Sequence, residues 1–255
     1  MQLALPRESA AKYHSASQRA RVATEEWAEE NLYCLKCSAN SLAPTPRGTP
    51  AIDFNCPDCK SPYQLKSLSR RFSYRIRDAA YSAMKQAIQT GNTPNLFVLS
   101  YGIDSWRVND LILVPSFAFT MSAVEKCPPL AATARRAGWI GCNILLGRIP
   151  ADAKIPIISS GKPESAASAR RHLKSLRPFS NLTLKRRGWT LDVLNVVRSL
   201  GKKSFTLDEV YVHADELAAL HPDNRHVRDK IRQQLQAIRD LKLLRFRGNG
   251  EYDLC

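Results

Sequence analysis

Apolar and polar positions follow two different periods in the first two thirds of the chain. Two stretches, 15–31 and 72–90, carry apolar residues at helical spacing, and the second ends at Gly91 and Pro94. Four shorter stretches are alternating or continuously apolar, as strands are, and these are 51–54, 63–68, 96–101 and 111–114. Strands and helices in this mixed order predict an α/β core around a mixed sheet.

The pattern changes near residue 190, where helices dominate and a hairpin ends the chain. Helices are predicted over 190–200, from about Thr206, and over 224–241. Thr206 with Glu209 has the spacing of a capping box. Two short strands then flank Gly248-Asn249-Gly250. Three helices followed by a hairpin predict a winged helix, and the Ser-, Gly-, Pro- and basic-rich segment 159–188 predicts a linker. We therefore expect domains at 1–180 and 181–255.

The net charge of the chain indicates which class of partner it binds. The 255 residues include 38 Lys+Arg against 23 Asp+Glu, a net charge of +15, with an ordinary 44% of apolar residues. Such a balance predicts a polyanionic partner, and DNA or RNA fits better than a membrane surface. No apolar run approaches the roughly 20 residues of a membrane span, and no apolar export signal is visible at the N-terminus. We expect a cytoplasmic protein with no membrane partner.

Four of the seven cysteines form a C-x2-C-x18-C-x2-C array: Cys34, Cys37, Cys56 and Cys59. Paired CxxC knuckles bring four thiolates onto one ion, which is the tetrahedral arrangement of structural zinc. In a reducing compartment such an array is more typical of zinc than of disulfides. Four thiolates leave no open position for water, so the predicted zinc is structural. Cys127, Cys142 and Cys255 show no such pairing.

Asp53, Gln64 and Lys66 are interleaved with this array as D-x10-Q-x-K. An acidic residue on one strand and E/Q-x-K on the next is the pattern of metal-dependent nucleases. The carboxylate of Asp53 and the amide oxygen of Gln64 are hard ligands suited to Mg²⁺. Lys66 would orient the attacking water and offset phosphate charge. Motifs this short also arise by chance on polar strand faces.

Several longer stretches give the chain a resemblance to a known family. These are the cysteine array, Ser17-Gln18-Arg19-Ala20-Arg21, Arg187-Gly188-Trp189-Thr190, residues 230–236 (KIRQQLQ) and, most specific, residues 129–144 (PLAATARRAGWIGCNI). Together they resemble the DpnI-type methyl-directed restriction endonucleases, which cut GATC sites bearing N6-methyladenine. The resemblance extends over nearly the whole chain. It implies a PD-(D/E)XK nuclease domain with a zinc knuckle, followed by a C-terminal winged helix, both reading methylated DNA.

Carried over by position, the resemblance makes Asp53 and Lys66 the catalytic Asp and Lys. Gln64 departs from the family's usual acidic residue and removes one negative charge from the metal site. Members of the wider nuclease superfamily also carry Gln at this place. We therefore expect an active enzyme with a raised metal requirement. A further carboxylate from Glu25 or Glu26 is the weaker alternative to solvated glutamates on a helix.

The remaining candidate residues are expected to contact DNA. Arg135, Arg136 and Trp139 suit a methylated adenine, since an aromatic face contacts a methyl group and arginines reach guanine edges or phosphates. A core tryptophan beside two solvated arginines is the competing interpretation. In the winged helix the third helix is expected in the major groove, and its candidates are Arg225, His226, Arg228, Lys230, Arg232 and Gln233. Arg245 and Arg247 on the wing are expected to hold phosphate.

The sequence thus predicts a type II restriction endonuclease that cuts double-stranded DNA at methylated GATC by Mg²⁺-dependent hydrolysis, acting as a monomer in the bacterial cytoplasm. The alternative is a binder of methylated DNA whose nuclease fold is catalytically weak or inactive, since Gln64 lacks a charge. A zinc-containing winged-helix transcription regulator is a third possibility, although it gives Asp53 and Lys66 no role.

Overall fold

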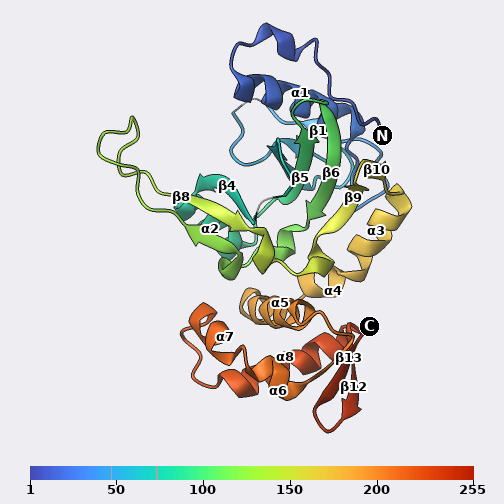
Figure 1. Cartoon of the computed structure of the whole chain (residues 1–255), viewed down its shortest axis with the longest axis vertical. Coiled ribbons are helices and arrows are strands. Elements are labelled where there is room, and N and C mark those ends of the chain that lie inside the picture. Colours follow the sequence, from blue (N-terminus) through green and yellow to red (C-terminus); the bar gives the residue numbers. More distant parts are fainter. Residues whose placement is uncertain (47, 73) are drawn as a thin grey trace.

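The computed structural model describes residues 1–46, 48–72 and 74–255. Within these ranges a seven-stranded sheet forms the centre of the N-terminal part, in the order β1-β2-β3-β5-β6-β9-β10 (Figure 1). Its strands are β1 (Ala43–Pro44), β2 (Phe54–Asn55), β3 (Pro62–Leu68), β5 (Asn95–Gly102), β6 (Arg107–Val114), β9 (Ile155–Ser159) and β10 (Lys162–Pro163). β3 and β5 are parallel while β5 and β6 are antiparallel, so the sheet is mixed, as predicted.

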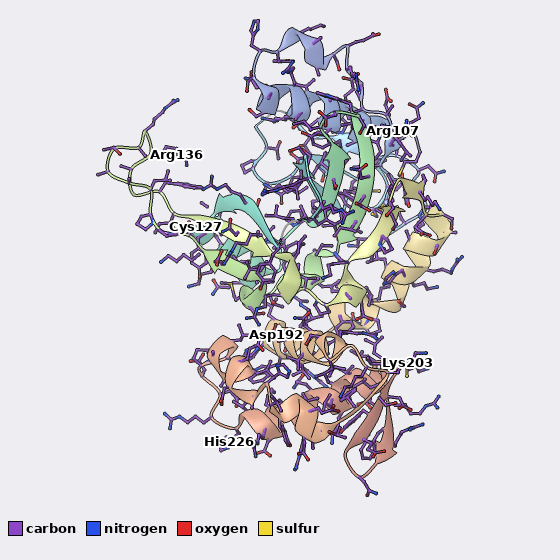
Figure 2. All side chains as sticks on the ribbon, viewed as in Figure 1. Arg107, Cys127, Arg136, Asp192, Lys203 and His226 are labelled. Atoms are coloured by element: carbon purple, nitrogen blue, oxygen red, sulfur yellow. The ribbon has the colours of Figure 1, made fainter. Side chains whose placement is uncertain are left out.

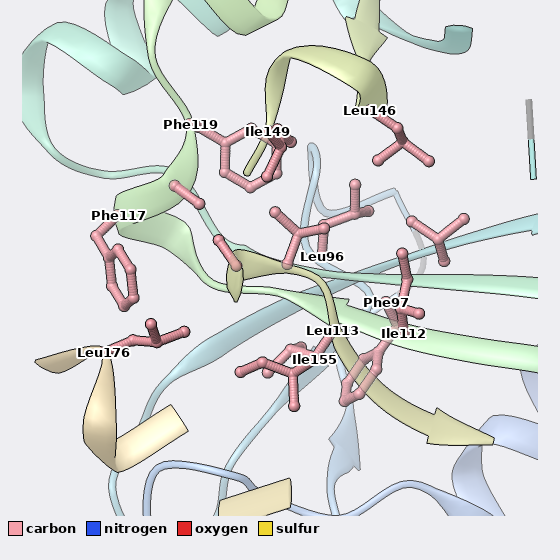
Figure 3. Close-up of a cluster of buried hydrophobic side chains, with 14 of the residues drawn as sticks. Leu96, Phe97, Ile112, Leu113, Phe117, Phe119, Leu146, Ile149, Ile155 and Leu176 are labelled. Carbon is pink, nitrogen blue, oxygen red and sulfur yellow. The ribbon is translucent and has the colours of Figure 1, made fainter. Parts of the chain in front are cut away.

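The middle of this sheet is almost continuously apolar, because both of its faces are covered. On β5, Leu96, Phe97, Val98 and Leu99 are at most 1% exposed. They belong to a core that also receives Phe117, Phe119 and Leu176 from loops and a helix outside the sheet (Figure 3). Helix α1 (Ala16–Asn31) packs against β3, and α3 (Ala166–Ser175) packs against β9. The predicted first helix is thereby confirmed.

A second sheet of three strands, ordered β4-β8-β7, extends from this core. Its elements are β4 (Arg75–Ala80), β7 (Val124–Lys126) and β8 (Gly141–Leu145), with α2 (Tyr81–Thr90) packed against them. The predicted helix over 72–90 is therefore wrong in its first half, and residue 73 lies outside the described ranges. Ile76 and Asp78 are buried while Arg75 and Arg77 are exposed, which is a strand period. Residues 75–80 are extended rather than helical because they pair with β8, which is distant in the sequence.

Two other predicted boundaries differ from the structure. The strand expected at 51–54 is reduced to Phe54–Asn55, because Ala51 has a positive φ of 58° and breaks the extended backbone. The expected linker at 159–188 instead contains β10, α3 and α4 (Arg177–Ser180). Short 3-10 helices lie at Ala10–Lys12, Ser116–Ala118, Met121–Ala123, Leu146–Arg148 and Ala151–Ala153.

The C-terminal part is a helical cluster with a small sheet, as expected for a winged helix. It contains α5 (Leu184–Ser199), α6 (Leu207–Tyr211), α7 (Ala214–Leu220), α8 (Val227–Asp240), β11 (Ser204–Thr206), β12 (Leu244–Gly248) and β13 (Glu251–Leu254). The first helix begins six residues earlier than predicted, at Leu184, where Thr183 caps it. The capping box of Thr206 and Glu209 is confirmed, with each side chain bonded to the other's backbone.

Polar contacts of α5 join the C-terminal part to the N-terminal part. Arg198 forms a bidentate pair with Asp152, with Nε 2.8 Å from Oδ2. The buried Asp192 accepts from Ser122 Oγ at 2.6 Å and lies 2.8 Å from His221 Nε2. The ring of His221 stacks on Trp189 with centroids 3.9 Å apart. These contacts are at the boundary between the two parts, where Figure 2 labels Asp192.

Candidate metal centre, active site and DNA interface

The four cysteines of the array converge as their spacing predicts. Their sulfur atoms all lie within 4.8 Å of one another, with Cys34 and Cys59 3.6 Å apart and Cys37 and Cys56 3.5 Å apart. A zinc ion about 2.3 Å from each of four tetrahedral sulfurs separates them by about 3.8 Å, so the cluster fits such an ion. Burial raises the pKa of the Cys34 thiol to about 12, so this sulfur ionises when a cation compensates its charge.

Two side chains outside the array hold this knuckle in place. Arg170 on α3 donates to the carbonyls of Cys34 at 3.0 Å and Ala39 at 2.8 Å. The hydroxyl of Tyr63 lies 3.1 Å from Cys34 Sγ. Tyr63 is fully buried on β3, directly before Gln64, so the cysteine cluster and the candidate active site share one strand. Sequence reasoning missed Arg170, because 136 residues separate it from Cys34.

Asp53 lies directly before β2, where its own backbone and side chain fix it to β3. Its N–H donates to the carbonyl of Tyr63 at 2.9 Å, and its Oδ2 accepts from the N–H of Leu65 at 2.7 Å. These two bonds aim the carboxylate across the hairpin at the strand that carries Gln64 and Lys66. Asp53 also lines the adjoining cavity. A carboxylate held in this way can hold a hard cation without reorganising.

Gln64 and Lys66 share a face of β3, as their alternation with Tyr63 and Leu65 predicts. Both contact the same carboxylate oxygen: Lys66 Nζ lies 2.7 Å from Oδ1 of Asp78, and Gln64 Nε2 donates to it at 3.1 Å. Asp78 was missed from the sequence because its segment was assigned to a helix. The alternation of Arg75, Ile76, Arg77 and Asp78 was the signal that could have found it.

Asp53, Gln64 and Lys66 line one open cavity of about 310 Å³. Arg21 and Glu25 of α1 line it as well. The guanidinium Nε of Arg21 lies 2.7 Å from Glu25 Oε1, and this bond raises the pKa of Arg21. The structure thus brings the predicted triad together beside a cation and a further carboxylate from the first helix. Carboxylate and amide oxygens at one edge of the cavity are the donors that Mg²⁺ prefers.

Residues 127–140 form a loop between β7 and β8, which we term the reading loop, and it projects from the body (Figure 1). Its ends are paired: Leu130 N donates to Trp139 O at 2.9 Å and Gly138 N to Leu130 O at 3.0 Å. Gly138 has φ +76°, a conformation that favours glycine. Arg136 stacks on the half-buried Trp139, 4.8 Å from its ring, while Arg135 is exposed. Trp139 is therefore on the loop and outside the core.

On α8 the apolar positions Ile231, Leu235 and Ile238 face inward. The predicted candidates lie on the opposite face or, for Arg225 and His226, directly before the helix. Lys230 is half-buried, and the exposed ones are Arg225, His226, Arg228, Arg232 and Gln233. Figure 2 places His226 on the side of the C-terminal part away from Asp192.

Several of these polar side chains are already positioned by neighbours. Arg228 and Arg232 lie over the ring of Tyr211 at 5.1 and 5.8 Å, and Lys230 Nζ donates to Gln233 Oε1 at 2.6 Å. The guanidinium groups of Arg228 and Arg232 are thereby held over an aromatic ring at the helix surface. On the wing, Arg247 pairs with Asp253 at 2.8 Å, and Arg245 is exposed. The whole forms a basic, pre-ordered surface of the kind that binds nucleic acid.

Among the described residues, no helix combines the length and the apolar character needed to cross a membrane. Comparison with protein families gives two matches that together span almost the entire chain. Residues 185–253 match the Dam-replacing helix-turn-helix domain, which agrees with the basic α8 surface and indicates DNA binding. Residues 1–181 match the DpnI, or Dam-replacing, family, which implies a nuclease of the restriction type. The chain belongs to the DpnI family, with a mixed α/β N-terminal domain that carries a four-cysteine cluster and a C-terminal helix-turn-helix domain.

Proposed function

We propose that this protein is a type II restriction endonuclease that cuts double-stranded DNA at GATC sites carrying N6-methyladenine, by Mg²⁺-dependent phosphodiester hydrolysis. The observation that carries the proposal is the meeting of Asp53, Gln64 and Lys66 at one cavity in a chain of the DpnI family. The N-terminal domain, taken as 1–180, then has the PD-(D/E)XK arrangement, and 181–255 is the winged helix.

In this mechanism Asp53 and Gln64 would hold Mg²⁺ through oxygen atoms, and the chemistry that the ion would supply is polarisation of the scissile phosphate and a lowered pKa of water. Asp53 is fixed for that role by its bond from Leu65 N–H. Lys66 orients the attacking water and offsets the charge that develops on the phosphate. Gln64 supplies an oxygen but no charge, so the site carries one negative charge fewer than with a glutamate and requires more Mg²⁺.

Zinc is proposed for the four-cysteine cluster, with Cys34, Cys37, Cys56 and Cys59 as ligands. Its role is structural, since four thiolates fill a tetrahedral shell. Tyr63 bonds to Cys34 and precedes Gln64, so the cluster stabilises the strand that carries the cleaving side chains.

Two surfaces read the DNA in this proposal. Trp139 of the reading loop presents an aromatic face to the N6-methyl group, with Arg135 and Arg136 reaching guanine edges or phosphates. The exposed face of α8, with Arg228, Lys230, Arg232 and Gln233, enters the major groove together with Arg225 and His226, which directly precede the helix. A Trp139→Ala variant that folds and cuts should lose discrimination between methylated and unmethylated sites. Unchanged discrimination would remove Trp139 from the reading surface.

The decisive test is digestion of one plasmid, prepared with and without adenine methylation at GATC, with and without Mg²⁺. Cutting of the methylated plasmid alone, only with Mg²⁺, is the expected result, and a Lys66→Ala variant should bind this plasmid without cutting it. The reaction should proceed with the protein as a monomer, the form that the proposal assigns to it in the bacterial cytoplasm.

A second function is favoured by Gln64 and by the engagement of Lys66 with Asp78. Residue 64 is a neutral amide, and Lys66 is already paired with a carboxylate. Such a site suits a protein that binds methylated DNA but cleaves it weakly or not at all. Retained binding to methylated DNA with no cutting at any Mg²⁺ concentration would establish this alternative and refute the nuclease.

A further inference from the structure

Asp78 is a carboxylate buried against two of the side chains proposed to cleave DNA. Its side chain is 1% exposed, while that of its partner Lys66 is 27% exposed. It comes from β4 of the smaller sheet, whereas Gln64 and Lys66 are on β3 of the larger one. A buried carboxylate between two sheets is retained only where partners compensate for its desolvation, and here Lys66 and Gln64 are those partners.

The contact with Asp78 decides which end of the Gln64 amide meets a cation. An ionised carboxylate only accepts hydrogen bonds, so Gln64 must turn its NH₂ group toward Asp78 Oδ1, 3.1 Å away. The carbonyl oxygen on the other branch of the amide is then available to a hard ion. Without Asp78 an amide has no preference between presenting its oxygen and presenting its nitrogen. A glutamate at the same place would have oxygen at both ends and would need no such orientation.

The same carboxylate oxygen fixes Lys66. A lysine side chain has four rotatable bonds, so ordering it on binding costs rotamer entropy. The 2.7 Å contact with Asp78 keeps the ammonium beside Gln64 before any substrate arrives. One buried atom therefore places both a proposed metal ligand and the proposed cationic group.

The backbone of β4 is irregular at this residue. The register between β4 and β8 shifts between Arg77 and Ala80, so that Asp78 and Ala79 form a β-bulge. Bulges often occur beside active sites, and here the bulge follows the alternation that buries Ile76 and Asp78 on one face. Here Cys142 Sγ donates to Ala79 O at 3.3 Å and helps hold the bulge. The direction of Asp78 is thus built into the strand.

From these observations we infer that Asp78 is a positioning residue of the cleavage site, which presents the oxygen of Gln64 to the catalytic metal and holds Lys66 in place. The inference rests on the proposed function. It assigns Asp78 no contact with substrate.

The test compares four proteins with the wild type, all loaded with zinc. Asp78→Leu removes the acceptor at similar volume, and Asp78→Asn keeps an oxygen but loses the charge. The double variant, Asp78→Leu with Gln64→Glu, has at position 64 a side chain with oxygen at both ends, which needs no orientation. Its carboxylate also gives Lys66 a new partner. Asp110→Asn is the control, since Asp110 is likewise a hydrogen-bond acceptor, in its case for the N–H of Ser160 at 2.8 Å, but lies outside the cavity. The readouts are Mn²⁺ affinity without DNA, by calorimetry, and kcat and KM on a methylated duplex.

Asp78→Leu should lower kcat and Mn²⁺ affinity by about 10- to 100-fold, as changes to groups that orient metal ligands do, with KM for DNA unchanged. Asp78→Asn should fall between this variant and the wild type. The double variant should recover most of both losses, and the control should match the wild type. Wild-type behaviour of both single variants at Asp78 would overturn the inference. So would losses that the added glutamate fails to restore, which would make Asp78 merely structural.

Failure of the proposed function is separable from failure of this inference. A wild-type protein that never cuts methylated DNA refutes the nuclease, yet its Mn²⁺ affinity still reports on Gln64. If Asp78→Leu does not fold, the Mn²⁺ affinity of Asp78→Asn decides the question, and a wild-type value would overturn the role.

Discussion

Gln64→Glu is a substitution whose expected outcome changes once the position of Asp78 is known. The side-chain nitrogen of Gln64 donates to Asp78 at 3.1 Å, and the substitution replaces this bond with two facing carboxylates. At that separation, two negative charges repel by about 5 kcal/mol at an effective dielectric constant of about 20. Lys66 offsets part of this repulsion, because it already neutralises Asp78 at 2.7 Å. Even half of the repulsion is enough to raise the pKa of the introduced carboxyl well above its ordinary value.

The consequence is a pH-dependent metal site. Below the raised pKa the introduced carboxyl holds a proton that a metal ion must expel, so Mn²⁺ affinity should rise with pH and then level off. The variant should therefore bind Mn²⁺ more tightly than the wild type only at the higher pH. The effect of pH on folding stability has the opposite sign. Because the folded state binds the extra proton, the free energy of unfolding of the variant should fall relative to that of the wild type as pH rises through that pKa.

Calorimetric titration with Mn²⁺ measures both effects of the introduced charge. The titrations are made from about pH 6 to about pH 8.5, in two buffers of different ionisation enthalpy, so that released protons are counted. The Gln64→Glu protein should release more protons per bound ion than the wild type near neutral pH. Equal proton release by the two proteins would refute the reasoning. So would a lower cleavage rate for the variant at every Mg²⁺ concentration.

Three further outcomes follow from other parts of the chain. Arg170→Ala should lower the free energy of unfolding by about 2–4 kcal/mol, since buried carbonyls lose their donor, and chemical denaturation should show Arg170→Lys failing to restore it. Burial raises the pKa of Cys142 to about 12, so alkylation of the native zinc-loaded protein near pH 8 should label the exposed Cys255 and spare Cys142, as mass spectrometry would reveal. Arg245→Ala should weaken binding equally on all sequences and reduce the salt slope of binding by about 1, whereas a changed sequence preference would contradict a phosphate contact.

The features that the sequence predicted well are those encoded within a few residues. The paired CxxC spacing places four sulfurs in one cluster, and the alternation of Tyr63, Gln64, Leu65 and Lys66 places two polar groups on one face. The capping box at Thr206 likewise depends on residues only three apart. In each case the local chain carries enough information to fix the geometry.

The features that escaped prediction depend on contacts between distant segments. β4 was taken for a helix because its pairing partner, β8, lies more than sixty residues further along the chain. With the strand misassigned, Asp78 could not be placed beside Lys66. Arg170 was missed for the same reason, since its contact with Cys34 spans 136 residues. Sequence periodicity does not report such pairings, and tertiary contacts override it.

The β-bulge at Asp78 and the reading loop belong to the same small sheet but to different segments of the chain. Asp78 lies at an extra residue inside β4, and the reading loop joins the same sheet through β7 and β8. Substitutions or length changes in that loop therefore leave the bulge, and the groups that Asp78 holds, in place. If the loop reads the target sequence and the cavity cuts as proposed, a lineage with this architecture can acquire a new target sequence by mutating one exposed loop while it keeps the same cleavage site.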